Sequence, residues 1–111
     1  MSKTSEIKFN VTVDENFVPE KIEWQASDNQ EKGISNCKAA MISLWDEAEK
    51  NTLRIDLWTK EMMIDEMKQF FFQTLMTMSD TYERATGEKD IADEIRAFGS
   101  ELAQKMKNKN S

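Results

Sequence analysis

Two segments near the start of the chain alternate between apolar and polar residues. In residues 5–13 and 21–27 every second side chain is apolar, which is typical of a strand with one face toward water. The apolar positions are Ile7, Phe9, Val11, Val13, Ile22, Trp24 and Ala26. Turn-forming residues 14–16 lie between the segments, and Pro19 disfavours a helix across the join. We therefore predict two antiparallel strands, connected by a loop longer than a two-residue turn.

The segment 38–46 allows two interpretations. As a strand it places Ala40, Ile42 and Leu44 on one face and Met41 and Trp45 on the other. As a helix it aligns Cys37, Met41, Leu44 and Ala48. The strand is favoured because residues 52–58 also alternate and would complete a hairpin across the polar link 47–51. The polar residues 28–36 before it predict a loop.

After residue 62 the apolar period changes from two to 3.6. Residues 63–86 place most of their apolar side chains within an arc of about 140° on a helical wheel, and Gly87 suits a C-cap. The arc contains Met63, Met67, Phe70, Phe71, Leu75, Met78, Tyr82 and Ala85. A second helix is predicted from about 89 to 107, with acidic residues at its start and lysines at its end, as the helix dipole favours. Its apolar stripe contains Ile91, Ile95, Phe98, Leu102 and Met106.

This order of elements predicts an α+β fold. We expect an antiparallel four-stranded sheet with the two C-terminal α-helices packed on its apolar face. The length of 111 residues fits a single domain, covering residues 1–107, followed by a frayed tail at 108–111. In this arrangement Phe71 would lie in the core between the helices and the sheet.

Charge and composition exclude several classes of function. The chain has 21 acidic and 15 basic residues, and its net charge of −6 argues against a nucleic-acid partner because phosphate binding needs a basic surface. It has no histidine and one cysteine, which excludes histidine-dependent triads, the usual zinc sites and an internal disulfide. Neighbouring acids such as Asp65 and Glu66 point in different directions on a helix. We therefore expect no enzymatic activity, no cofactor and no bound metal.

The sequence contains no apolar stretch typical of a membrane span or a signal peptide. Its apolar runs are a few residues long, such as 70–72, whereas a span needs about 20 residues. Together with the lone Cys37, this predicts a cytoplasmic protein without membrane insertion.

Phe72 and Met76 lie one helical turn apart on a mainly polar flank of the predicted long helix. Two interpretations stay open for this pair: packing on the second helix, or a docking surface for another protein. The chain also has eight methionines, five of them on or beside this helix. Flexible thioethers suit either a core or an adaptable binding surface.

The predicted strand 52–58 carries Arg54, Asp56 and Trp58 on the face opposite its apolar residues. If 38–46 is its partner, Trp45 belongs to the same surface. A tryptophan flanked by charges suits a contact with another protein. The alternative is a cross-strand cluster that stabilises the sheet.

Several long runs in the chain carry a resemblance. They are Leu53-Arg54-Ile55-Asp56-Leu57-Trp58-Thr59-Lys60-Glu61-Met62, Asp65-Glu66-Met67-Lys68, Phe70-Phe71, Gln73-Thr74-Leu75 and Asp80-Thr81-Tyr82-Glu83-Arg84-Ala85-Thr86. With the opening residues 5–11 and 18–21, they resemble the gliding-motility protein GldC family of the Bacteroidetes over residues 3–107. None of these runs is a catalytic signature, so they indicate a family without indicating an activity.

The resemblance implies a small soluble accessory protein of surface gliding, a movement coupled to the type IX secretion apparatus, without known enzymatic activity. It supplies no binding residues, so the candidate interaction residues come from the physical patterns alone. They are Phe72, Met76, Trp45, Arg54, Asp56 and Trp58. We expect an adaptor that binds a protein of the motility or secretion machinery. The alternative is a cytoplasmic export-chaperone-like protein, as a homo-oligomer, that binds unfolded secreted clients.

Overall fold

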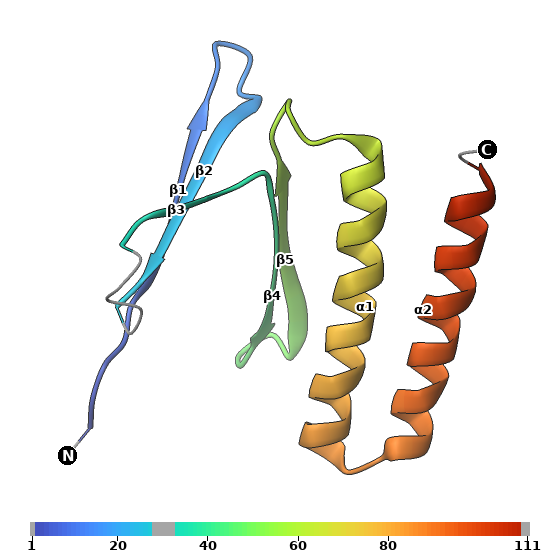
Figure 1. Ribbon diagram of the computed structural model, residues 1–111. Coiled ribbons are helices and arrows are strands. Elements are labelled where there is room, and N and C mark those ends of the chain that lie inside the picture. The colour runs from blue at the N-terminus through green and yellow to red at the C-terminus, as the bar shows by residue number, and fades with distance from the viewer. Residues whose placement is uncertain (1, 28–32, 110–111) are drawn as a thin grey trace. The chain divides into compact units, whose positions relative to one another are not determined.

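The computed structural model describes residues 2–27 and 33–109, which form five strands and two helices (Figure 1). The strands are β1 (Ile7–Val13), β2 (Pro19–Ala26), β3 (Ser35–Cys37), β4 (Ala39–Asp46) and β5 (Asn51–Trp58). The helices are α1 (Ile64–Thr86) and α2 (Lys89–Lys109). The chain divides between Met62 and Met63 into two compact units, one of strands and one of helices.

The strands form two antiparallel sheets, so the predicted single four-stranded sheet is wrong. The first sheet has the order β1-β2-β3, and the second is the β4–β5 hairpin. The break lies at Lys38, where the chain bends between β3 and β4. Cys37 shares a face with Ile22. The apolar face of β4, which carries Ala40, Ile42 and Leu44, begins at Ala40, an odd number of residues later. A continuous strand would place these apolar sets on opposite faces, and the bend removes that conflict.

The β1–β2 pairing confirms the first predicted antiparallel pair. Phe9 lies opposite Trp24 and Val11 opposite Ile22, so the alternating apolar residues share one face. Ile22 also lies opposite Cys37 of β3 and is 1% exposed. β3 falls at the end of the segment predicted to be a loop, whose residues 28–32 lie outside the described residues. The three residues of β3 are too few to show alternation in the sequence.

The β4–β5 hairpin confirms the strand interpretation of residues 38–46. Ala40 lies opposite Leu57, Ile42 opposite Ile55, and Leu44 opposite Leu53. At the turn, the Lys50 N–H donates to the Asp46 carbonyl at 2.9 Å. The Asp46 side chain accepts a second bond from the Glu49 N–H at 2.7 Å. The polar link thus closes the hairpin as its composition predicts.

The helical unit is an antiparallel hairpin of α1 and α2 (Figure 1). The Glu66 carboxylate accepts a bond from the Met63 N–H at 3.0 Å at the start of α1, and Gly87 ends it in the left-handed region at φ 76°. Helix α2 extends two residues beyond its predicted end at 107. Ser79, Ala92 and Gly99 are buried. The packing of these helices on an apolar strand face, and the single domain 1–107, stay predictions.

Candidate protein-interaction surfaces

The polar side of the β4–β5 hairpin contains four of the six predicted interaction residues. The register places Trp58 opposite Ala39, Asp56 opposite Met41, Arg54 opposite Ser43, and Thr52 opposite Trp45. Directly opposed residues of an antiparallel pair share a face, so these eight residues form one surface, here called the Trp face. Strand alternation therefore brings Trp45, Arg54, Asp56 and Trp58 together on one surface, as the sequence predicts.

An ion pair occupies the middle of the Trp face. Arg54 Nη2 donates to Asp56 Oδ1 at 2.7 Å and Arg54 Nε donates to Asp56 Oδ2 at 3.3 Å, a two-bond arrangement. Arg54 Nη1 also donates to Ser43 Oγ across the strands at 2.8 Å. The hydrogen bond from Arg54 lowers the pKa of Asp56, and the same bond raises the pKa of Arg54. Both side chains therefore stay ionised, and their hydrogen bonds fix their orientation.

The two tryptophans lie at opposite ends of the Trp face and are exposed to solvent. Trp45 is 70% exposed and Trp58 is 58% exposed. Six residues along the ladder separate their pairing positions, which corresponds to about 20 Å. They therefore form two separate aromatic contact points with the ion pair between them, rather than one aromatic cluster.

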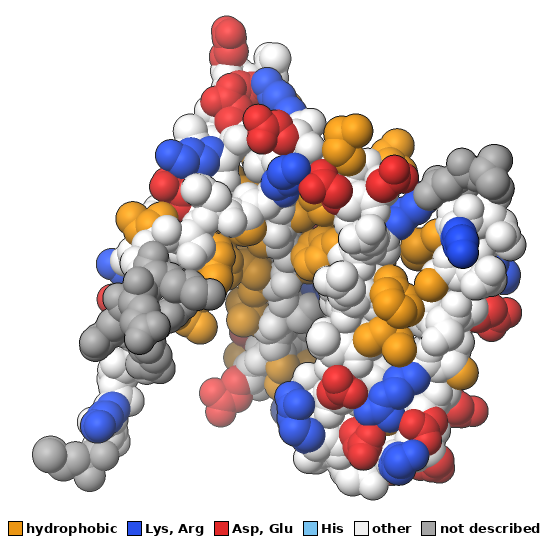
Figure 2. All heavy atoms as spheres, in the orientation of Figure 1, with side chains coloured by type: hydrophobic (Ala, Val, Ile, Leu, Met, Phe, Trp, Pro, Cys, Tyr) orange, Lys and Arg blue, Asp and Glu red, His pale blue; other side chains and the backbone are white. Residues whose placement is uncertain are grey.

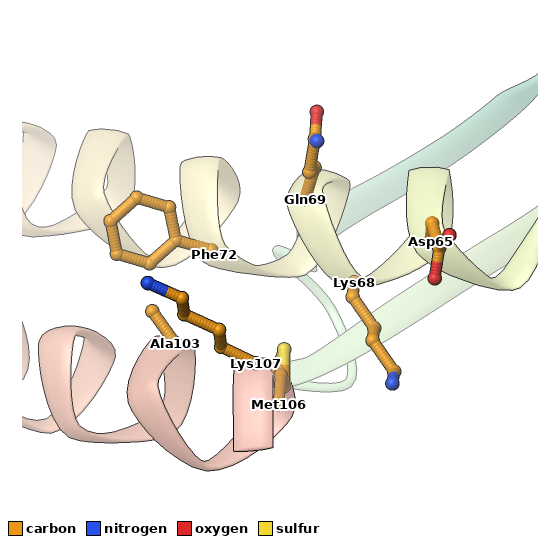
Figure 3. Close-up of a pocket in the computed structure, with 7 residues that line it drawn as sticks. All are labelled: Asp65, Lys68, Gln69, Phe72, Ala103, Met106 and Lys107. Carbon is orange, nitrogen blue, oxygen red and sulfur yellow. The ribbon is translucent and has the colours of Figure 1, made fainter. Parts of the chain in front are cut away.

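Phe72 and Met76 lie at the junction of the two helices and are half-buried. The sulfur of Met76 would lie 3.1 Å from a Cβ at Gly99, which shows how closely the two helices approach. Phe72 lines a hollow of about 340 Å³, together with Ala103 and Met106 of α2 (Figure 3). The hollow lies at the open end of the hairpin, where α1 begins and α2 ends. The charged side chains Asp65, Lys68 and Lys107 surround this hollow. The structure places both residues toward α2, which favours the interpretation that the pair packs on the second helix.

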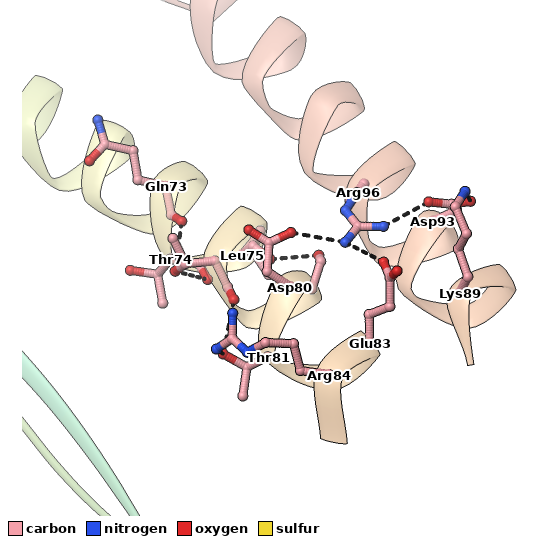
Figure 4. Close-up of polar contacts among 12 residues, drawn as sticks. Gln73, Thr74, Leu75, Asp80, Thr81, Glu83, Arg84, Lys89, Asp93 and Arg96 are labelled. Atoms are coloured by element: carbon pink, nitrogen blue, oxygen red, sulfur yellow. Dashed lines mark hydrogen bonds and ion pairs between the residues drawn. The ribbon is translucent and has the colours of Figure 1, made fainter. Parts of the chain in front are cut away.

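A network of ion pairs links the two helices at the closed end of the hairpin, where α1 ends and α2 begins. Arg96 of α2 donates from Nη2 to Asp80 at 2.9 Å and to Glu83 at 2.8 Å, both on α1 (Figure 4). Its Nη1 donates to Asp93 at 2.7 Å. These hydrogen bonds, with that to Asp80 the largest cause, raise the pKa of Arg96 above its ordinary value. Figure 2 shows charged side chains of both signs gathered at this end of the helices.

A comparison with known protein families identifies a match to this chain. The model of a family described as gliding motility-associated protein GldC-like matches residues 19–108. The chain belongs to the GldC-like family. No curated protein and no solved structure matches the chain. The matched region includes β2 to β5, α1 and all but the last residue of α2, and so contains the whole Trp face.

One polar cluster of this GldC-like chain was not predicted. Asp14 accepts bonds from the N–H groups of Asn16 at 2.8 Å and Val18 at 3.0 Å, and its other oxygen lies 2.5 Å from Lys60 Nζ. The hydrogen bond from Lys60 is the largest cause that lowers the pKa of Asp14 from 3.8 to about 2. The sequence indicates the turn at Asp14, but nothing in it pairs that residue with a lysine after β5.

Cys37 of β3 is a half-buried free cysteine. It lies opposite Ile22 in the β2–β3 pairing, and burial raises the pKa of its thiol. A raised pKa lowers the fraction of reactive thiolate at neutral pH.

Two properties of residues 2–27 and 33–109 bear on other kinds of site. Neither helix is long and apolar enough to cross a bilayer. No group of three or more His, Cys, Asp or Glu side chains in the same residues is placed to hold a metal ion.

Proposed function

We propose that this GldC-like protein is a non-enzymatic adaptor of gliding motility that binds a protein of the motility or type IX secretion machinery through its Trp face. The family description supports the association with gliding motility. The observation that carries the adaptor role is the exposure of Trp45 and Trp58 on either side of the Arg54–Asp56 ion pair. The proposal keeps the cytoplasmic location expected from the sequence.

The residue types of the Trp face fit a contact with a protein. Tryptophan and arginine are enriched among the residues that contribute most to binding energy, and an exposed indole gains by burial in a partner's pocket. The ion pair is held in place by three hydrogen bonds, so little side-chain entropy is lost when a partner binds over it. The ion pair therefore preorganises the middle of the Trp face, and the two tryptophans provide apolar contact residues at its ends.

The spacing of the tryptophans limits the kind of partner. A contact that buries both indoles must extend over about 20 Å. An interface of standard size buries about 800 Å² on each partner and reaches over such a distance, whereas a small-molecule pocket does not. The partner is accordingly a folded protein surface or an extended polypeptide.

Gliding of complemented cells tests this function. Cells that carry Trp45→Ala/Trp58→Ala in place of the wild-type gene should lose spreading, although the protein accumulates and melts as the wild type does. The matched control is Phe17→Ala, which removes an exposed aromatic residue from the β1–β2 turn of the same unit. Normal gliding of the double variant would refute the Trp face as the functional surface.

A second function, an export-chaperone-like role, is favoured by the apolar side of the same hairpin. Leu44, Leu53 and Ile55 are each about half exposed there. Exposed apolar strand faces suit the binding of unfolded polypeptides. A chaperone should suppress the aggregation of a denatured secreted protein, as light scattering would show. It should do so equally well with both tryptophans replaced, which separates this role from the adaptor.

A further inference from the structure

The two helices together present one apolar face. On α1, Met78 and Asp80 lie about 100° to either side of the buried Ser79, and Phe98 and Ser100 flank Gly99 of α2 in the same way. Arg96 lies on the Ser100 side of α2 and bonds to Asp80, so these two flanks form the charged face of the hairpin. The flanks that carry Met78 and Phe98 consequently share the opposite face.

The side chains of this apolar face are large and exposed. Phe71 and Met78 follow one another at seven-residue spacing on α1 and are 47% and 52% exposed. Phe98 on α2 is 54% exposed, and Ile91 lies seven residues before it. A face of this composition on a helical pair is typical of a packing surface.

Charge is distributed unevenly along the helical hairpin. Residues 69–79 and 97–100, which form its middle, contain no charged side chain. Residues 80–96, at the closed end, contain six acidic and three basic side chains, a net charge of −3. Residues 64–68 and 101–109, at the open end, contain three acidic and four basic side chains, a net charge of +1.

We propose that the apolar face of α1 and α2 binds the same face of a second copy of this chain, with the helices of the two copies antiparallel. In this arrangement the acidic closed end of each copy lies against the basic open end of the other, and the uncharged middles meet. The parallel arrangement would bring two ends of net charge −3 together, which is repulsive. This inference does not depend on the Trp face, which lies on the hairpin of strands.

The symmetry of the dimer pairs particular residues. The contacts of Gly99 with Leu75 and Met76 set these residues at the same level along the hairpin. Phe71 lies about 6 Å to one side of Leu75 and Met78 about 4.5 Å to the other side, at 1.5 Å per residue. A two-fold axis at this level therefore places Phe71 of each copy beside Met78 of the other, a favourable sulfur–aromatic contact. Phe98 lies close to the axis and meets the Phe98 of the second copy.

Sedimentation equilibrium of the full chain tests the dimer. The wild type should have about twice the chain mass of 12.9 kDa. Phe71→Glu and Met78→Lys should each give the monomer mass. The two changes combined should restore the dimer, because the carboxylate introduced in each copy then meets the ammonium group introduced in the other. Gln73→Glu, which adds the same charge on the charged side of α1, should remain dimeric.

Three results would overturn the proposal. They are a monomeric wild type, a dimer unaffected by Phe71→Glu, and a double variant no more dimeric than the single ones. If the chain's own strands cover this face instead, Phe71→Glu lowers the melting temperature without any change of mass.

A disulfide test covers the case in which the charged variants fail to fold. In a Cys37→Ser background, Phe98→Cys should form a disulfide between copies under mild oxidation, because the two residues meet at the axis. Ser100→Cys on the charged face should not. Equal crosslinking at positions 98 and 100 would also overturn the proposal.

Discussion

Asp14 shows how one carboxylate stabilises the connection between two strands. It receives two backbone N–H donors from its own turn and the ammonium group of Lys60, and its side chain is only 11% exposed. All three donors favour the ionised form, so its pKa falls to about 2. The carboxylate thus joins the β1–β2 turn to the chain that follows β5.

The lowered pKa of Asp14 predicts a specific acid sensitivity. The pKa of Asp14 in the folded chain lies below its ordinary value of 3.8, so the ionised carboxylate stabilises the fold. This contribution of Asp14 to the free energy of unfolding is fully present above pH 3.8 and is lost as the pH falls toward 2. Carboxyl NMR should give a titration midpoint for Asp14 near 2, and Lys60→Met should raise it toward the ordinary value. Lys8→Met, which leaves Asp14 and its partners intact, is the control. An unchanged midpoint in Lys60→Met would contradict the pairing.

Gly99 determines how closely the two helices approach. A Cβ at this position would lie 3.1 Å from the sulfur of Met76 and 3.7 Å from Cβ of Leu75. We expect Gly99→Ala to be close to neutral, because the gain in helix propensity of about 1 kcal/mol offsets a contact that a flexible thioether can relieve. Gly99→Leu should lower the free energy of unfolding by about 1–3 kcal/mol through overpacking.

Urea unfolding measures how much Gly99→Ala and Gly99→Leu change the free energy of unfolding. The control is Ser100→Leu, which adds a leucine to the neighbouring exposed position. Equal stabilities of the Gly99→Leu and Ser100→Leu variants would show that the helices do not meet at Gly99.

At the scale of elements, the end of α1 depends on a left-handed residue. Gly87 has φ 76°, and its N–H donates to the Glu83 carbonyl at 2.8 Å. Replacement by Ala should destabilise the helical hairpin by about 1–2 kcal/mol because a Cβ disfavours this conformation. Gly87→Asn should cost less, since Asn tolerates it better. Thermal unfolding followed by circular dichroism should rank the stabilities as wild type, then Gly87→Asn, then Gly87→Ala. Equal losses of stability in the two variants would argue against the cap.

The sequence predicts those elements whose apolar period is long and regular. The 3.6 period after Met62 predicts both helices, and strict alternation predicts β1, β2 and β5. The division into two sheets could not be predicted, because it depends on a bend at the single residue Lys38 and on a three-residue strand. Register between distant strands is a property of the fold that local pattern does not specify.

The candidate surfaces were predictable to different degrees. Trp45, Arg54, Asp56 and Trp58 share a face because alternation within a hairpin is local and strict. The position of Phe72 toward α2 required the neighbouring helix, since a helical wheel gives a direction but not what lies there. The contact between Asp14 and Lys60 joins residues far apart in the sequence, and no pattern connects them.

For the molecule as a whole, we propose that the two units have separate roles. The strand unit carries the Trp face, which is proposed to bind a partner, and the helical unit carries the face proposed to join two copies. A dimer of this kind would present two Trp faces and would strengthen binding to a repeated or dimeric partner through its two sites.

Photo-crosslinking in gliding cells can show whether the Trp face binds a protein of the motility machinery. A photoreactive residue is placed at position 45, at position 58, or at the exposed Asn10 on the polar face of β1 as a control. We expect covalent adducts from positions 45 and 58 to one and the same motility or secretion component, and none from position 10. Adducts that are absent at 45 and 58, or that match those from position 10, would contradict this expectation.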